Sequence, residues 1–168
     1  MLSLAISSNA EAGAAFGMIL AKRSNADIME FGDTARYIQY DLRASVLDFA
    51  SGFRTLNRVG HGTNFLSIFG TANKRYDRVV IFSDMQGWMG WTSPVEAFKQ
   101  YKRKFNIDPF IYSVDLTGYG SLQFPENKVF ALAGFSGEMF TLMEKLETDR
   151  HAMVNTIKSL DFNDYLPK

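Results

Sequence analysis

The chain has no cysteine and only two histidines among its 168 residues. Without cysteine it can form no disulfide, no thiolate metal site and no thiol nucleophile. Because His61 and His151 are the only histidines, a metal site built from three imidazoles is excluded as well. A metal that binds here has to be a hard cation such as Mg²⁺, which takes oxygen ligands from Asp, Glu, Ser, Thr and water.

The chain also lacks an excess of either charge and any unbroken apolar run of membrane length. Its 18 basic residues balance 18 acidic ones, so the totals give no electrostatic footprint for a nucleic-acid backbone. The apolar N-terminal segment has no basic start, is interrupted by Glu11 and is too broken to span a bilayer. We therefore expect a cytoplasmic chain that makes no membrane contact.

Helical and extended patterns alternate along the chain, which predicts an α/β fold with helices on both faces of a mostly parallel sheet. Strands are predicted at 27–31, 36–40, 78–82, 109–116 and 129–135, the first two forming an antiparallel hairpin through a Gly32-Asp33-Thr34 turn. Helices are predicted near 4–23, 45–56, 64–74, 94–105, 138–147 and 151–160, with Ser93 and Ser136 as two of the N-caps.

Two loops carry the residues best suited to bind a ligand: G-H-G-T-N (60–64) and F-S-D-M-Q (82–86). Ligands of open α/β sheets bind at the carboxyl ends of the strands, where the second loop is expected. The Thr63 hydroxyl and the Asp84 carboxylate are oxygen ligands of the kind that Mg²⁺ uses. Each also has a simpler interpretation, Thr63 as a helix N-cap and Asp84 as an acceptor in a turn.

Other residues of these loops are tentative partner-binding residues. Trp88 and Trp91 follow Asp84 in the stretch VVIFSDMQGWMGW, where they act either as binding anchors or as caps on the edge of the core. His61, Asn64 and Gln86 belong to the two loops themselves, although His61 between two glycines also fits a plain loop residue.

The order of these segments resembles the von Willebrand factor A (vWA) domain, most narrowly the C-terminal vWA domain of Ro-type (TROVE) RNA-binding proteins. The likeness runs from N-A-E-A-G-A-A-F-G-M through E-F-G-D, G-H-G-T-N and F-S-D to E-A-F-K-Q-Y-K-R-K-F-N. The resemblance implies a three-layer, Rossmann-like α/β/α fold with a metal-ion-dependent adhesion site (MIDAS). Thr63 and Asp84 match that site's threonine and its second aspartate, and would hold Mg²⁺.

The sequence departs from the family in one respect, because the Asp-x-Ser-x-Ser segment that ends the family's first strand is absent. We accordingly expect the first, central strand to be missing and Mg²⁺ binding to be weakened. Residues 1–168 are then a single vWA-like domain, a C-terminal fragment of a longer Ro-type protein. A missing central strand would leave backbone groups unpaired, which indicates a fragment, a downstream start, or a strand supplied by a partner or a second copy. A second copy would give a homodimer formed by strand pairing or swapping.

By resemblance, the domain is a non-enzymatic module that recruits a protein ligand through a carboxylate bridged to Mg²⁺. It would belong to a ribonucleoprotein whose other domain binds the RNA. One alternative is a metal-free structural or oligomerisation domain. The other is a Mg²⁺-dependent hydrolase or phosphoryl-transfer domain that uses Asp84, with Asp115 as a second strand-end carboxylate. Against an enzyme, the chain has no G-x-x-x-x-G-K-S/T loop and no G-x-S-x-G elbow.

Overall fold

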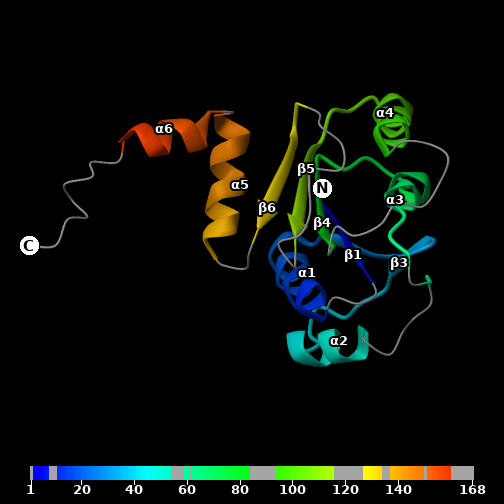
Figure 1. Ribbon diagram of the computed structural model, residues 1–168. Coiled ribbons are helices and arrows are strands. Elements are labelled where there is room, and N and C mark those ends of the chain that lie inside the picture. Colours follow the sequence, from blue (N-terminus) through cyan, green and yellow to red (C-terminus); the bar gives the residue numbers. More distant parts are fainter. Residues whose placement is uncertain are drawn as a thin grey trace, which may run out of the picture. The chain divides into compact units, whose positions relative to one another are not determined.

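A computed structural model describes residues 2–7, 11–53, 59–60, 62–83, 94–115, 127–133, 137–149 and 151–159. The chain divides into two compact units, residues 1–134 and 135–168. The described part of the first unit carries a six-stranded sheet with the strand order β3-β2-β1-β4-β5-β6 (Figure 1). Its strands are β1 (Leu2–Ser7), β2 (Asp27–Phe31), β3 (Ala35–Ile38), β4 (Arg78–Ser83), β5 (Phe110–Asp115) and β6 (Val129–Ala133).

The central strand of the sheet is β1, which lies between β2 and β4 and runs parallel to both. This corrects the prediction that the central strand is missing, and no gap is left for a second copy to fill. It also shortens the predicted first helix, since α1 spans Glu11–Ser24. The predicted helix near 4–23 overlaps the strand LSLAIS because the small and apolar residues of this strand run on into the alanine-rich stretch that follows. The first-turn acid Glu11 marks where the helix begins.

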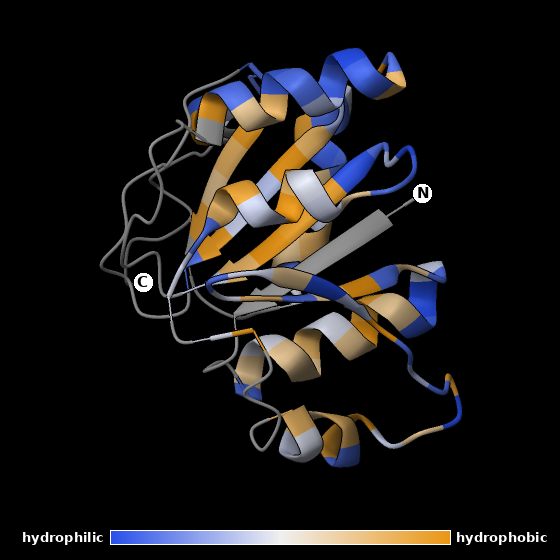
Figure 2. Cartoon of the chain, turned by 90° about the vertical axis from the view of Figure 1, so that its right-hand side faces the viewer, coloured by the Kyte–Doolittle hydropathy of each residue, from blue (hydrophilic) through white to orange (hydrophobic). Residues whose placement is uncertain are grey.

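The remaining strand pairs follow the prediction. β2 and β3 form the predicted antiparallel hairpin, while β4 pairs in parallel with β5 and β5 with β6. Residues 79–82 of β4 are all buried, as expected for a parallel strand covered on both faces. Figure 2 shows these apolar strands beneath a helix at the top, α4 (Pro94–Phe105), whose outward side is hydrophilic.

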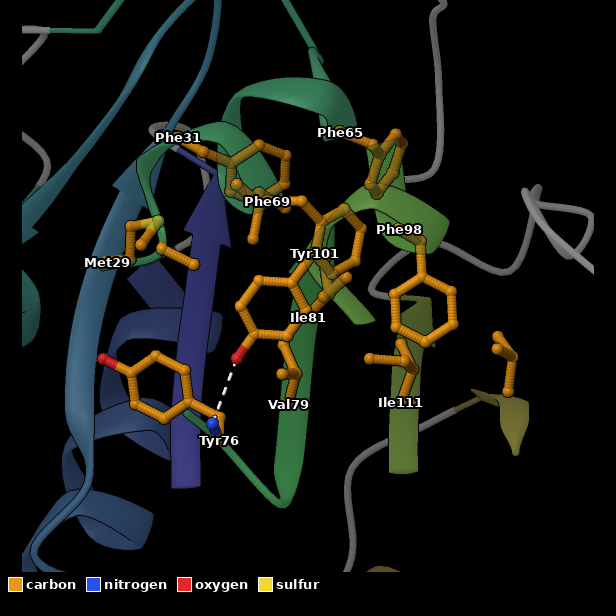
Figure 3. Packing of buried hydrophobic residues seen from close by; sticks show 13 residues of the cluster. Met29, Phe31, Phe65, Phe69, Tyr76, Val79, Ile81, Phe98, Tyr101 and Ile111 are labelled. Carbon is orange, nitrogen blue, oxygen red and sulfur yellow. Dashed lines mark hydrogen bonds between the residues drawn. The ribbon is translucent and has the colours of Figure 1, made fainter. Parts of the chain in front are cut away.

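One face of the sheet is covered by α3 (Phe65–Thr71) and α4 (Pro94–Phe105), and an aromatic core fills the space between. The ring of Phe69 lies 5.1 Å from that of Phe98 and 5.8 Å from that of Tyr101, measured between centroids (Figure 3). Val79 and Ile81 reach this core from β4. Full burial of each large apolar side chain stabilises the fold by roughly 1.5–3 kcal/mol.

The opposite face is covered by α1, and α2 (Val46–Phe53) packs against α1 (Figure 1). The buried residues of α1 include the small ones Gly13, Ala14, Gly17 and Ala21, which allow a close approach of the helix to the sheet. Phe16 of the same helix lies 6.5 Å from Phe82 of β4, ring centroid to ring centroid. The two faces of the sheet therefore pack with different kinds of side chain.

The second unit contains the two predicted C-terminal helices, α5 (Glu138–Thr148) and α6 (Ala152–Ser159). The N-cap of α5 is Gly137, which offers no side-chain bond, and not the predicted Ser136, which lies outside the described residues. Across the described part of the chain, no helix is both long enough and apolar enough to cross a membrane.

Candidate functional site at the carboxyl edge of the sheet

Buried polar side chains concentrate where the parallel strands end. Of the five buried polar or charged residues among those described, only Ser113 lies inside a strand away from this edge. Ser83 and Asp115 are the last residues of β4 and β5 and align with each other across the two strands. Glu30 is the penultimate residue of β2, and Thr63 precedes α3. Because burying a polar group costs free energy unless it is well bonded, this edge is the candidate functional site.

The loops at this edge are joined by what we call the loop clamp, formed by residues 32–34, 59–60 and 62–64. Main-chain bonds link Thr34 N to Val59 O at 3.1 Å and Asn64 N to Gly32 O at 2.9 Å. The Asp33 carboxylate accepts a further bond from the Gly62 N–H at 2.9 Å. The clamp therefore fixes the backbone on both sides of Thr63.

Two glycines make the clamp sterically feasible. A Cβ on Gly32 would lie 2.5 Å from the carbonyl oxygen of Gly60, and both groups belong to the backbone. Gly60 itself has a φ of +85°, a conformation that residues with a side chain rarely adopt. Glycine is thus required at positions 32 and 60, where the two loops approach each other closely.

Asn64, and not Thr63, is the N-cap of α3. The Asn64 side chain accepts a bond from Leu66 N at 3.1 Å and donates one to the Asp33 carbonyl at 3.0 Å. This removes helix capping as the explanation for Thr63, which is 8% exposed in the same loop. The tentative partner-binding residue Asn64 already uses both ends of its amide within the chain.

Glu30 is a second carboxylate near this edge, and its role was not foreseen from the sequence. It is fully buried and forms an ion pair with Arg36, its partner across the β2–β3 hairpin, at 2.9 Å. Its second carboxylate oxygen, Oε1, has no hydrogen-bond partner within the described structure. The signal available in the sequence was an acid inside an apolar strand, with an arginine opposite it across a short turn.

The other predicted site residues, His61, Asp84, Gln86, Trp88 and Trp91, lie outside the described residues. Within the described ranges, no group of three or more histidines and carboxylates is close enough together to hold a metal ion. The buried side-chain oxygens that the structure does place near this edge come from Glu30, Thr63, Ser83 and Asp115.

The strand order, the single antiparallel edge pair and the polar carboxyl edge define a Rossmann-like α/β domain of the vWA class. The chain belongs to the Ro60 vWA domain family, whose model matches residues 1–147. The crystal structure of the Ro (RSR) protein of Deinococcus radiodurans has the same fold, with a TM-score of 0.65 and 22% sequence identity. That match covers 84% of this chain but 32% of the Deinococcus chain, so the present chain spans about a third of its length.

A more distant structural match is proximal thread matrix protein 1 from the mussel byssus. One of its structures has a TM-score of 0.47 at 12% identity, covering 87% of this chain and 47% of that one. A second, which has a zinc-occupied MIDAS motif, has a TM-score of 0.48 at 11% identity, with the same coverage. Among curated proteins, no sequence matches the chain.

Proposed function

We propose that this vWA domain is a non-enzymatic module that binds a protein ligand through the carboxyl edge of its sheet. The observation that carries the proposal is the group of buried polar side chains at that edge, from Thr63, Ser83 and Asp115, with Asp84 following directly in sequence. The rigid loop clamp supports this reading, because a binding surface on a fixed backbone loses little entropy when the ligand binds.

Within this proposal, Thr63 and Asp84 hold a divalent cation, Mg²⁺, with water as the remaining ligands. The donor types fit, since Mg²⁺ in proteins keeps several waters and uses one or two carboxylates. The sequence at and after the end of β1 reads Ser7-Ser8-Asn9, which offers side-chain oxygens but no carboxylate. Because this segment contributes no negative charge, we expect the site to bind Mg²⁺ weakly. When bound, the cation supplies a coordination position for a carboxylate of the ligand.

The test is a titration of the full chain with MgCl₂ or MnCl₂, followed by tryptophan fluorescence and by calorimetry. Asp84→Asn and Thr63→Val remove one proposed ligand each with little change in volume. Asp108→Asn, at the opposite end of the sheet, is the matched control. We expect weak, saturable binding that both site variants lose and the control keeps. Equal binding by all four proteins would rule out this site.

A metal-free binding or assembly domain is the second candidate, favoured by the lack of a carboxylate after β1 and of a ligand cluster among the described residues. In that case the titration gives no heat in any variant, and the mass measured by light scattering does not depend on Mg²⁺. The filled centre of the sheet removes the original reason to expect strand swapping. A Mg²⁺-dependent hydrolase would instead turn over phosphoesters, with activity lost in Asp84→Asn.

Membership of the family supports a proposal about the wider setting. We propose that the domain is part of a longer Ro-type protein in a cytoplasmic ribonucleoprotein, where a separate domain makes the main contact with RNA. Two facts support this proposal: the membership of the Ro60 vWA domain family and the partial coverage of the Deinococcus Ro protein. Co-purification of RNA with the full-length protein, compared with this chain alone, would test it.

A further inference from the structure

A cavity of about 230 Å³ lies at the amino edge of the sheet, the end opposite to the candidate site. Its walls come from the start of β2, the end of β3 with the residues after it, and the loop that follows α3. The polar and aromatic side chains of its lining are those of Asp27, Tyr37, Gln39, Tyr40, Asn73 and Lys74. The volume is below the roughly 300–1,000 Å³ of sites for drug-sized ligands, so a single ring system is the size of group that fits.

The wall of this cavity is fixed by a hydrogen-bond network. Tyr76 donates its hydroxyl to Asp27 Oδ2 at 2.7 Å and lies 2.9 Å from the hydroxyl of Tyr37. Tyr101 of α4 accepts the Tyr76 N–H at 3.0 Å and donates to the Lys74 carbonyl at 3.1 Å (Figure 3). Because these residues are already held in place, a ligand would not have to order them.

The charge of the cavity favours a neutral ligand. The Lys74 ammonium lies 2.8 Å from Asp27 Oδ2, so one positive and one negative group stand side by side. The Lys74 ammonium is protonated at neutral pH, and the hydrogen bond to Asp27 raises its pKa further above the ordinary value of 10.5. A cationic ligand such as an arginine side chain would meet Lys74, and an anionic one would meet Asp27. A neutral group with both donors and acceptors avoids either repulsion.

The donors and acceptors of the lining that remain available to a ligand match the hydrogen-bonding edge of a nucleobase. Both bonds that the described residues make to Asp27 fall on Oδ2, which leaves Oδ1 as an acceptor. The Lys74 ammonium has three N–H donors, of which Asp27 takes one. The exposed amides of Asn73 and Gln39 each add donors and an acceptor. Tyr37 and Tyr40 also line the cavity, and aromatic rings are groups on which bases stack.

From this arrangement we propose that the cavity is a nucleobase-binding site, with guanine as the preferred base. Guanine presents two adjacent N–H donors, one for Asp27 Oδ1 and one for an amide oxygen of Asn73 or Gln39, beside a carbonyl oxygen, which matches the Lys74 ammonium. The base comes either from a free nucleotide or from a single-stranded nucleic acid. This site is independent of the metal-assisted function proposed for the carboxyl edge.

The experiment titrates the ¹⁵N-labelled full chain with guanosine, inosine, adenosine, cytidine and uridine, and with the RNA pentamers UUGUU and UUAUU. Binding is followed by amide chemical shifts and calorimetry. Lys74→Met and Asn73→Ala alter the cavity. Arg75→Ala, which removes a neighbouring cation that does not line the cavity, is the matched control. Circular dichroism checks that each variant is folded.

We expect guanosine to shift amides of residues 37–40 and 73–74 and to bind about tenfold more tightly than inosine, which lacks the 2-amino group. Lys74→Met and Asn73→Ala should each weaken binding about tenfold, while Arg75→Ala leaves it unchanged. Binding of UUGUU alone, with the same dependence on the two variants, identifies a strand as the source of the base. The proposal is overturned if neither guanosine nor UUGUU binds, or if binding survives in both cavity variants. It is also overturned if pentamer binding depends on Arg75 and not on Lys74, because phosphate contacts then explain it.

Discussion

Different chemical groups form the hydrogen bonds at the carboxyl edge and at the amino edge of the sheet. At the carboxyl edge each of the four bonds described between the two loops of the loop clamp has a backbone group on at least one side, and two join backbone to backbone, such as that from Asn64 N to Gly32 O at 2.9 Å. At the amino edge the bonds come mainly from side chains, such as the Tyr76 hydroxyl on Asp27 at 2.7 Å. Backbone groups are common to nearly all residues, whereas hydroxyl and carboxylate partners are not. Site residues at the carboxyl edge can therefore be substituted while the backbone bonds of the loop clamp are kept. The network at the amino edge requires particular side chains.

We expect the largest effect from a substitution that disrupts the loop clamp at the carboxyl edge. Gly32→Ala would place a methyl group 2.5 Å from the Gly60 oxygen and 2.8 Å from the Val59 oxygen, and neither backbone atom can move away easily. We expect a loss of about 3 kcal/mol in the free energy of unfolding, measured by urea denaturation. Gly70→Ala, where no atom lies within 4 Å of the new Cβ, is the control and should be neutral or slightly stabilising. A stable Gly32→Ala protein would mean that the loops are not held this closely.

The next largest loss of stability is expected from substitutions that remove hydroxyl groups from the hydrogen-bond network at the amino edge. Tyr101→Phe removes the acceptor of the buried Tyr76 N–H and the donor to the Lys74 carbonyl. Leaving a buried donor without a partner should lower stability by about 1–3 kcal/mol. Tyr76→Phe removes the bonds to Asp27 and Tyr37 and should cost a similar amount. Because Tyr76 and Tyr101 belong to one network, the double variant should lose less than the sum of the two single losses. Simple additivity would show that the hydroxyls act independently.

The same comparison shows what the sequence could and could not predict. The run at 79–82 and the hairpin through Gly32 were predictable, because burial on both faces and tight turns leave local patterns. The network at the amino edge was not, since Tyr76 and Asp27 are 49 residues apart and meet only through the fold.

Local ambiguity explains the remaining errors. Thr63 and Asn64 are both good capping residues, and only the extended backbone of Asn64, with φ −102° and ψ 90°, decides between them. β1 was missed because its six residues run on into a helix of similar composition. What sets it apart is its pairing with β2 and β4, a property of the whole sheet.

Alkaline pH should weaken the amino edge selectively. Burial raises the pKa of Tyr101 from 10.0 to about 12, and it also raises the pKa of Tyr76. The folded chain therefore holds these protons more tightly than the unfolded chain. The resulting stability is complete below about pH 10 and is lost as the pH rises towards about 12. Urea denaturation at a series of pH values should show this fall, and Tyr101→Phe should make it shallower. An equal slope in the variant would count against Tyr101 as a source.

A smaller effect distinguishes the two bonds of the Asn64 side chain, the helix cap on Leu66 N and the loop-clamp bond to the Asp33 carbonyl. Asn64→Ala loses the cap on Leu66 N and the bond to the Asp33 carbonyl, and should destabilise the chain by about 1–2 kcal/mol. Asn64→Asp keeps an acceptor for the cap but loses the donor to Asp33, so it should recover most of the loss. Thermal unfolding of the three proteins measures both steps. If Asn64→Asp is as unstable as Asn64→Ala, the bond to Asp33 matters more than the cap.

The smallest effect marks the limit of the amino-edge network. Arg75 lies 3.4 Å from Asp77, but both side chains are more than 60% exposed, at 64% and 63%. Water and salt screen such a pair, which is worth roughly 0–1 kcal/mol. We expect Arg75→Ala to change the free energy of unfolding by about 0.5 kcal/mol or less, and the change to shrink further in high salt. A loss as large as that of Tyr101→Phe would mean that the network extends to the surface pair. Because Arg75→Ala is also the control for the nucleobase titration, a small effect keeps that comparison free of differences in stability.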